Sequence, residues 1–207
     1  GAPIFDDDFE GYTAGSPIGL PWTATINDSG DGQERAHVIT DSGNLLGGGT
    51  SNQMLFIRAQ GGGGSNNAEA LISGQFADNQ LTLSFDFAEP NDTLGDMTFY
   101  AGRGIPNNNA KFAYVHFNNC VVSADGSSDT GSYTGQGPVH VDVLINATNG
   151  PASYAGGTLA GNTYDVFLDG VLAIDDALNQ GNNTTGNIIQ SRLYASGNGS
   201  GYVDNFV

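Results

Sequence analysis

The sequence is poor in positively charged residues. Its 207 residues contain five Lys and Arg against 22 Asp and Glu, so the formal net charge is -17, and Lys111 is the only lysine. With so few Lys and Arg, we expect no basic patch that could hold nucleic acid or an anionic membrane. Carboxylates without basic partners attract cations, and this balance favours a protein that binds calcium.

Cysteine and long apolar runs are also scarce. Cys120 is the only cysteine, which excludes a disulfide framework, and no Cys or His spacing is typical of a zinc site. Its surroundings, FNNCVVSA, predict a small buried side chain rather than a reactive thiol. No stretch is apolar enough to cross a membrane, so we expect no membrane insertion. The composition favours a secreted protein of the cell surface or extracellular matrix.

Helical periodicity is missing as well. The 32 glycines and the many Asn, Asp, Ser and Thr residues disfavour helices and favour turns. Apolar residues instead recur at every second position in QLTLSFDFAE (80–89) and VHVDVLIN (139–146), which is typical of strands with one face in a core. TYDVFLDGVLAID (163–175) predicts a hairpin that turns at Asp169-Gly170. These patterns predict an all-β fold: a single antiparallel β-sandwich domain of jelly-roll type, with about a dozen strands, over residues 1–207.

The two ends of the chain carry a family resemblance. The opening FDDDFEGYTAGSPI, the late hairpin YDVFLDGVL and the closing GYVDNFV resemble the laminin-G-like, concanavalin A-like jelly rolls of secreted bacterial proteins, including surface proteins with a PEP-CTERM sorting tail. The resemblance implies a concanavalin-like sandwich. Its members include carbohydrate-binding modules, polysaccharide-degrading enzymes and surface proteins. It also implies a structural calcium ion where the first and last strands lie side by side.

The acidic stretch IFDDDFEGY (4–12) supplies the candidate ligands for such an ion. In a strand, Asp6, Asp8 and Glu10 share one face, whereas Asp7 shares the other face with two Phe residues of the expected core. Asp7 is therefore out of place unless a bulge turns it away. If the terminal strands pair, the oxygen ligands of calcium are Asp6, Asp7, Asp8, Glu10, Asp204 and Asn205. The alternative is a solvated edge strand whose charges prevent association.

Other acidic segments are weaker calcium candidates. NDSGDGQE (27–34) spaces its oxygen atoms like the first half of a calcium loop, but Val38 stands where an EF-hand needs a bidentate Glu. Turn chemistry explains this segment as well. Asp125 with Asp129, and Asp175 with the adjacent Asp176, are similar candidates.

Aromatic residues suggest a place for a glycan. Flat aromatic rings match the apolar faces of sugar rings, but Trp22, the only tryptophan, lies in LPWTATI, which predicts a core strand. The weak glycan-binding candidates are Tyr100, Tyr114, His116 and Tyr194, with Tyr133 and Tyr154 as further tyrosines.

One strand raises the question of catalysis. AKFAYVHFNN (110–119) places Tyr114 and His116 on one face, near Lys111 and Arg103. In jelly-roll polysaccharide lyases, Tyr, His and Arg on a sheet remove a proton and stabilise the enolate. However, the strings that identify those lyases and the E-x-D-x-x-E strand of sandwich glycosidases are absent. We therefore predict that the protein is not an enzyme, with a lyase as the least favoured function.

Two non-catalytic functions remain. Lysine side chains on edge strands commonly prevent two sheets from pairing edge to edge, and this sequence has almost no lysine. Calcium would screen the electrostatic repulsion between anionic copies of the protein. These points favour a secreted, calcium-binding protein that self-assembles with copies of itself into an extracellular fibre or layer. The alternative is a lectin-like carbohydrate-binding module that recognises a polysaccharide.

Overall fold

The computed structural model describes residues 5–27, 35–59, 66–90, 97–104, 110–134, 137–179 and 186–207. These residues form 16 strands and no α-helix. Within these ranges there is consequently no helix that could span a membrane. The all-β prediction is confirmed, with more strands than the dozen expected.

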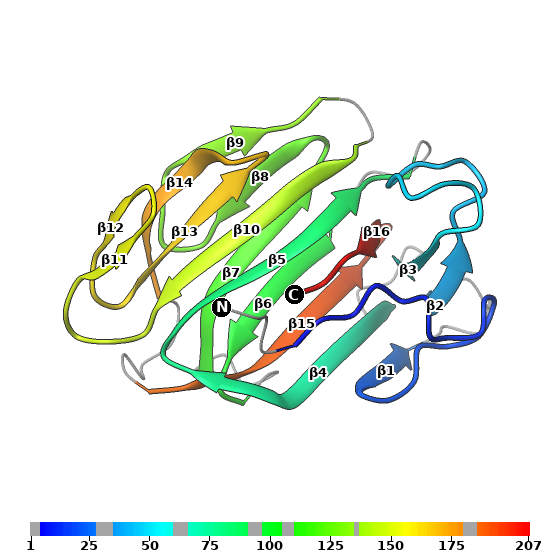
Figure 1. The fold of residues 1–207 in the computed structure, drawn as a ribbon, viewed down its shortest axis with the longest axis horizontal. Helices are drawn as coiled ribbons and strands as arrows, with labels where there is room; N and C mark the ends of the chain where they lie inside the picture. The colour runs from blue at the N-terminus through cyan, green and yellow to red at the C-terminus, as the bar shows by residue number, and fades with distance from the viewer. Residues whose placement is uncertain are drawn as a thin grey trace.

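Most strands belong to two seven-stranded antiparallel sheets that lie face to face as a sandwich (Figure 1). In spatial order, the first sheet contains β1 (Trp22–Asn27), β4 (Asn67–Asp78), β15 (Ile188–Ser196), β6 (Met97–Gly102), β7 (Lys111–Asn118), β8 (Val121–Ala124) and β9 (Thr130–Ser132). The second contains β14 (Val171–Leu178), β13 (Thr163–Leu168), β10 (Val139–Asn146), β5 (Gln80–Ala88), β16 (Ser200–Asp204), β3 (Gln53–Arg58) and β2 (Arg35–Thr40). A small separate pair joins β11 (Ala152–Tyr154) to β12 (Gly157–Leu159). The predicted jelly-roll sandwich is thus confirmed.

The strands follow the alternation in the sequence. β5 and β10 pair with Phe85 opposite Val141, and both side chains are fully buried. The predicted hairpin forms β13 and β14, and its turn residues Asp169 and Gly170 have φ angles of 49° and 76°. Two positive φ angles in succession are the conformation that Asp-Gly favours in tight hairpins. The predicted strand and turn are both confirmed.

The core lies between the two sheets and is rich in aromatic rings. Phe85 of β5 meets Phe99 of β6 at a centroid distance of 5.3 Å, and Phe87 of β5 meets Phe117 of β7 at 4.5 Å. Trp22 is 1% exposed, as predicted. Cys120 departs from its prediction. It is half-buried rather than buried, because it sits in the tight β7–β8 turn with a φ of 62°, and its amide donates to the Glu89 carboxylate.

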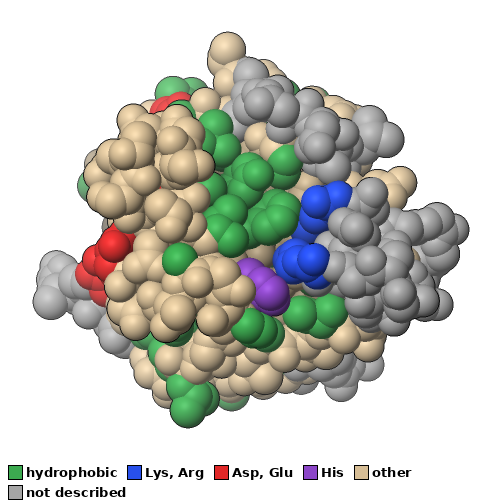
Figure 2. Space-filling view, turned by 90° about the vertical axis from the view of Figure 1, so that its right-hand side faces the viewer, with side chains coloured by type: hydrophobic (Ala, Val, Ile, Leu, Met, Phe, Trp, Pro, Cys, Tyr) green, Lys and Arg blue, Asp and Glu red, His purple; other side chains and the backbone are tan. Residues whose placement is uncertain are grey.

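A second, smaller apolar cluster lies outside the second sheet, beside β2, β3 and β16. Its buried members are Leu46, Met54 and Ala88, and Tyr202, which packs against them, stacks on Phe56 with ring centroids 4.9 Å apart. Figure 2 looks at the side on which β2 and β3 lie in Figure 1, and it shows a hollow lined by hydrophobic side chains beside a histidine and Lys or Arg side chains. His37 of β2 lies on this side, where burial and then the charge of Arg35 lower its pKa. This part of the surface is apolar and locally basic, unlike the chain as a whole.

Candidate functional site

Three neighbouring strands of the first sheet present aromatic and basic side chains on the face turned away from the core. Each strand alternates: Phe99, Val115 and Leu193 are buried in the core, and the residues on either side of them point outward. β6 is the central strand, with β15 on one side and β7 on the other. The outward residues form what we call the tyrosine face: Tyr100, Lys111, Tyr114, His116, Arg192 and Tyr194.

The rings of the tyrosine face contact one another. Tyr100 and Tyr114 are directly paired across β6 and β7 and stack with centroids 4.5 Å apart and an interplanar angle of 25°. The hydroxyl of Tyr100 donates to that of Tyr114 at 3.2 Å. His116 lies 4.3 Å from Tyr114 between ring centroids, and Tyr194 meets Tyr100 edge-on at 6.2 Å. Four rings from three strands therefore make one continuous surface.

Two cations lie against these rings. Lys111 Nζ is 4.4 Å from the centroid of Tyr100 and 5.0 Å from that of Tyr114. The Arg192 guanidinium lies 4.2 Å from the Tyr194 ring and 5.2 Å from the Tyr100 ring, and it forms an ion pair with Glu69 of β4. Such contacts are attractive because the face of an aromatic ring is electron-rich. Burial, and then the charge of Arg192, lower the pKa of Lys111.

The members of the tyrosine face differ in exposure. Tyr100 is 4% exposed and Arg192 is 9% exposed, so these two form the floor. Burial and the hydrogen bond with Tyr114 raise the pKa of Tyr100 and keep its phenol protonated. Lys111, Tyr114, His116 and Tyr194 are half-buried and can touch a ligand. At the margin, Nε2 of His116 lies 3.3 Å from Oδ1 of Asp125.

The structure brings together all four of the glycan-binding candidates named from the sequence. It adds two residues that sequence reasoning missed, Arg192 and Glu69. The alternation in QSRLYAS (190–196) indicates that Arg192 and Tyr194 share a face, but which strands lie beside β15 follows only from the fold. Tyr133 and Tyr154 lie elsewhere: Tyr133 donates to Glu89, and Tyr154 belongs to β11.

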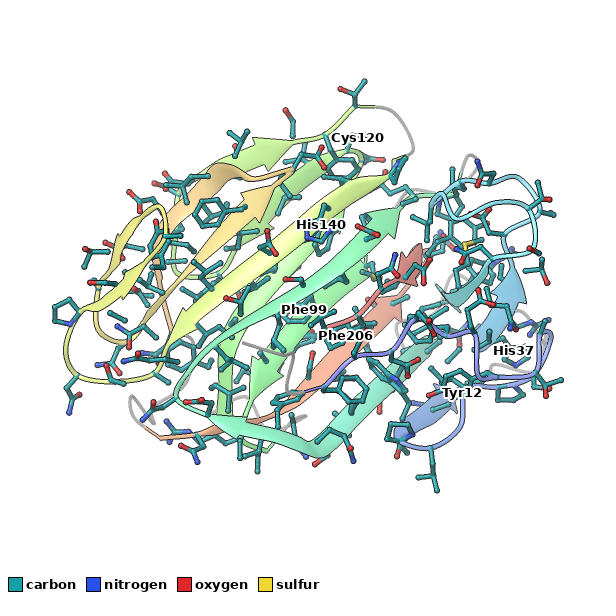
Figure 3. The ribbon with its side chains drawn as sticks, viewed as in Figure 1. Tyr12, His37, Phe99, Cys120, His140 and Phe206 are labelled. Carbon is teal, nitrogen blue, oxygen red and sulfur yellow. The ribbon has the colours of Figure 1, made fainter. Side chains whose placement is uncertain are left out.

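The two chain ends meet, as predicted, although not as a regular strand pair. Asp7 and Phe206 form one antiparallel bridge, with N–O distances of 2.9 and 3.0 Å. Phe9 has a φ of 58°, which ends the extended segment, so the expected alternation of faces stops there. Figure 3 shows Phe206 and Tyr12 near this junction.

Asp7 points inward and is fully engaged by protein donors. Its Oδ1 accepts the backbone N–H of Phe9 at 2.9 Å, and its Oδ2 accepts the Tyr12 hydroxyl and the Trp22 indole N–H, both at 2.7 Å. Burial, and then the hydrogen bond from the Tyr12 hydroxyl to Asp7, raise the pKa of Tyr12. A turned backbone and a half-buried, hydrogen-bonded carboxylate therefore replace the bulge that the sequence suggested.

The other predicted calcium ligands lie around the same junction. Asp6, Asp8 and Glu10 are exposed, and Glu10 accepts the amide of Gln53 at 2.6 Å. Asp204 is 2% exposed and accepts from Asn52 at 2.7 Å. Burial raises the pKa of Asp204, and the charges of Asp86 and Asp8 act in the same direction. The exposed Asn205 donates to Asp86 at 2.8 Å. The calcium site at the termini stays a prediction.

The structure describes only some of the weaker calcium candidates that the sequence suggested. Ser29, Asp31 and Gly32 lie outside the described residues. Asp175 and Asp176 approach Asp165, and one carboxylate oxygen from each lies within 4.8 Å of the others. Asp165 is buried, and it accepts the amide of Asp176 at 2.7 Å and the hydroxyl of Tyr154 at 3.3 Å. An acidic cluster is therefore present on β13 and β14.

Comparisons with known proteins show the fold. The sequence matches no family model and no curated protein. Among solved structures, the cellulose-induced protein Cip1 has a TM-score of 0.58 at 10% identity, covering 98% of this chain and 95% of its own. The Bacteroides ovatus mixed linkage glucan GH16, in complex with a G4G4G3G product, has a TM-score of 0.55 at 12% identity, covering 99% of both chains. The Emp47p carbohydrate recognition domain has a TM-score of 0.50 at 10% identity, covering 93% and 89%.

These similarities correct two predictions. The concanavalin-like fold is confirmed, but the laminin-G and PEP-CTERM names find no support. The prediction that the protein is not an enzyme is wrong, because the same sandwich over the same length forms a glycoside hydrolase in Bacteroides ovatus. The self-assembling fibre finds no counterpart among these structures, which agree better with the carbohydrate-binding alternative.

Proposed function

We propose that the protein binds a polysaccharide on the tyrosine face, outside the cell. The observation that carries the proposal is the continuous ring surface of Tyr114, Tyr194 and His116, set on the Tyr100 floor. Sugar rings stack on such surfaces because their C–H faces are apolar, while nearby polar groups fix their orientation. Sandwich neighbours that are themselves glycan-binding or glycan-cleaving proteins support this function.

Polysaccharide affinity electrophoresis followed by calorimetry tests the proposal. Truncating Tyr114 to Ala removes a half-buried ring at the centre of the face, and base–aromatic stacking suggests a scale of about 1–3 kcal/mol for such a ring contact. We expect Tyr114→Ala to weaken binding at least about fivefold. Tyr154→Ala is the matched control, because Tyr154 is half-buried too but belongs to the small β11–β12 pair. Equal affinities for the two variants would contradict the site, and no binding to any polysaccharide would contradict the function.

Cleavage of the bound polysaccharide on the same face is a second candidate. The observation that favours it is His116, whose imidazole contacts both the Tyr114 ring and the Asp125 carboxylate. An imidazole oriented by a carboxylate beside a phenol can move a proton in general acid–base catalysis. Incubation with the bound polysaccharide, followed by assays for new reducing ends and for unsaturated uronate products, tests it. Because His116 also belongs to the ring surface, His116→Ala is assayed at a polysaccharide concentration that saturates the variant, where it should still abolish product formation.

A further inference from the structure

Basic residues gather at the tyrosine face although the protein is strongly acidic. Three of the five Lys and Arg residues of the chain lie on or beside the three strands: Arg103, Lys111 and Arg192. Lys111 pairs across the strands with Gly102, and Arg103 follows directly, where its amide donates to Ala110 at 2.9 Å. Composition alone argued against a basic patch, but the fold brings three of the five basic residues to these strands, whereas Arg35 and Arg58 pair on β2 and β3 of the other sheet.

These charges are only partly neutralised by the protein. Arg192 pairs with Glu69, yet its Nε is buried and has no hydrogen-bond acceptor within the described part of the chain. Lys111 forms no ion pair with any carboxylate of the described ranges. Its ammonium group instead lies over two phenol rings. Nη2 of Arg103 is likewise buried without an acceptor among these residues.

Lys111 and Arg192 contact the same ring. Both lie against Tyr100, at 4.4 Å and 5.2 Å from its centroid. Burial, and then the charge of Arg192, lower the pKa of Lys111. Of these two cations only Arg192 has a carboxylate partner, the half-buried Glu69. An added anion would stabilise such a pair, because a charge-assisted hydrogen bond is stronger than a neutral one.

We propose that the glycan bound by the tyrosine face is anionic, and that a carboxylate or sulfate group on its sugars binds Lys111 beside Arg192. This inference rests on the proposed function and names its ligand class. The half-buried ammonium of Lys111 makes the direct contact, and Arg192, fixed by Glu69 and two rings, supplies the second charge. Because the net charge of -17 repels polyanions at long range, binding depends on this local contact.

Calorimetric titration with three polysaccharides tests the inference. Polygalacturonate carries carboxylates, dextran sulfate carries sulfates, and hydroxyethyl cellulose is neutral. We expect at least about a tenfold tighter dissociation constant for one of the two anionic polymers than for the neutral one. Tighter binding of polygalacturonate assigns the anion as a carboxylate, and tighter binding of dextran sulfate assigns it as a sulfate.

Variants of Lys111 separate a specific contact from general attraction. Lys111→Gln should weaken binding of the anionic polymer about tenfold, and by a larger factor than it weakens any binding of the neutral polymer, whereas Lys111→Arg should retain most of the affinity for the anionic polymer. Arg35→Gln is the control, because it makes the same change in net charge on β2 of the other sheet. The comparison of polymers uses the unaltered protein, so a variant that fails to fold cannot affect its result.

The contrary outcomes are distinct. Equal binding of neutral and anionic polymers, or equal losses in Lys111→Gln and Arg35→Gln, would overturn the anionic ligand and leave the proposed function in place. Failure of every polysaccharide to bind would overturn both.

Discussion

The indole N–H of Trp22 donates a hydrogen bond to Oδ2 of Asp7 with an N–O distance of 2.7 Å. This contact joins the N-terminal segment to β1, while the backbone of the same Asp7 pairs with Phe206 near the C-terminus. The Trp22 ring also meets Phe206 at a centroid distance of 5.1 Å. Asp7, which looked out of place in the sequence, thus links the two ends of the chain: its carboxylate binds Trp22 and its backbone pairs with Phe206.

Asp7→Asn should destabilise the fold by about 1–3 kcal/mol, because an amide cannot accept all three hydrogen bonds and leaves a donor unpaired. Asp6→Asn is the control, since Asp6 is the exposed neighbour. Urea unfolding can be followed by the fluorescence of Trp22, the only tryptophan. Equal unfolding midpoints for the two variants would show that the Asp7 contacts add no stability.

Calcium should raise the unfolding temperature if the ligands predicted at the termini bind it. A ligand that binds only the folded state at about 100 times its Kd adds roughly 2.7 kcal/mol. Asp8→Asn should reduce this effect, because Asp8 is exposed beside the Asp7–Phe206 bridge. Asp175→Asn, in the separate cluster on β13 and β14, should not. Identical thermal unfolding in calcium and in chelator would contradict the site, and a loss confined to Asp175→Asn would move it to the other cluster.

His140 should make stability depend on pH near neutrality. Its Nδ1 lies 2.7 Å from Asp86 and its Nε2 lies 3.3 Å from Asp142. Burial lowers the pKa of His140, but the hydrogen bond to Asp86 and the charges of Asp142 and Asp86 outweigh it, so the pKa is raised in the folded state. The resulting stability is full below the unfolded pKa of about 6.5 and is lost as pH rises through the folded value.

The measurement is the difference in unfolding free energy between the unaltered protein and His140→Gln across this pH range. The difference should favour the unaltered protein at low pH and shrink as pH rises. Because the imidazole is 45% exposed, water screens the pair and the effect should be at most about 1 kcal/mol. A difference that grows with pH would contradict this assignment.

Alternation in the sequence was enough to predict the long strands β5 and β10, their buried faces and the β13–β14 hairpin, because these depend on neighbours in the chain, but not the short strands β9, β11 and β12. The tyrosine face could be predicted only in part. Tyr114 and His116 share one strand, but Tyr100 meets Arg192 only because β6 pairs with β15 across 92 residues. Long-range pairing of this kind leaves no local signal.

The junction of the termini shows the same limit. The family resemblance of the two terminal motifs implied that the ends pair, and alternation placed Asp7 on the face of the core Phe residues. The positive φ of Phe9 and the hydrogen bonds that satisfy the Asp7 carboxylate could not be predicted. A single residue in the left-handed region reverses the faces that a strand pattern assigns. Asp165 was missed for a related reason, since register shifts between β13 and β14 bring it to Asp176.

The central claim is that a glycan binds on the outer face of β6, β7 and β15. Its most direct test is the change in backbone amide chemical shifts when the isotope-labelled protein is titrated with oligogalacturonate and, separately, with cellohexaose. The account predicts shifts concentrated on Tyr100, Lys111, Tyr114, His116, Arg192 and Tyr194 and their strand neighbours. Shifts confined to the second sheet, around β2, β3 and β16 or around β5 and β10, would contradict it.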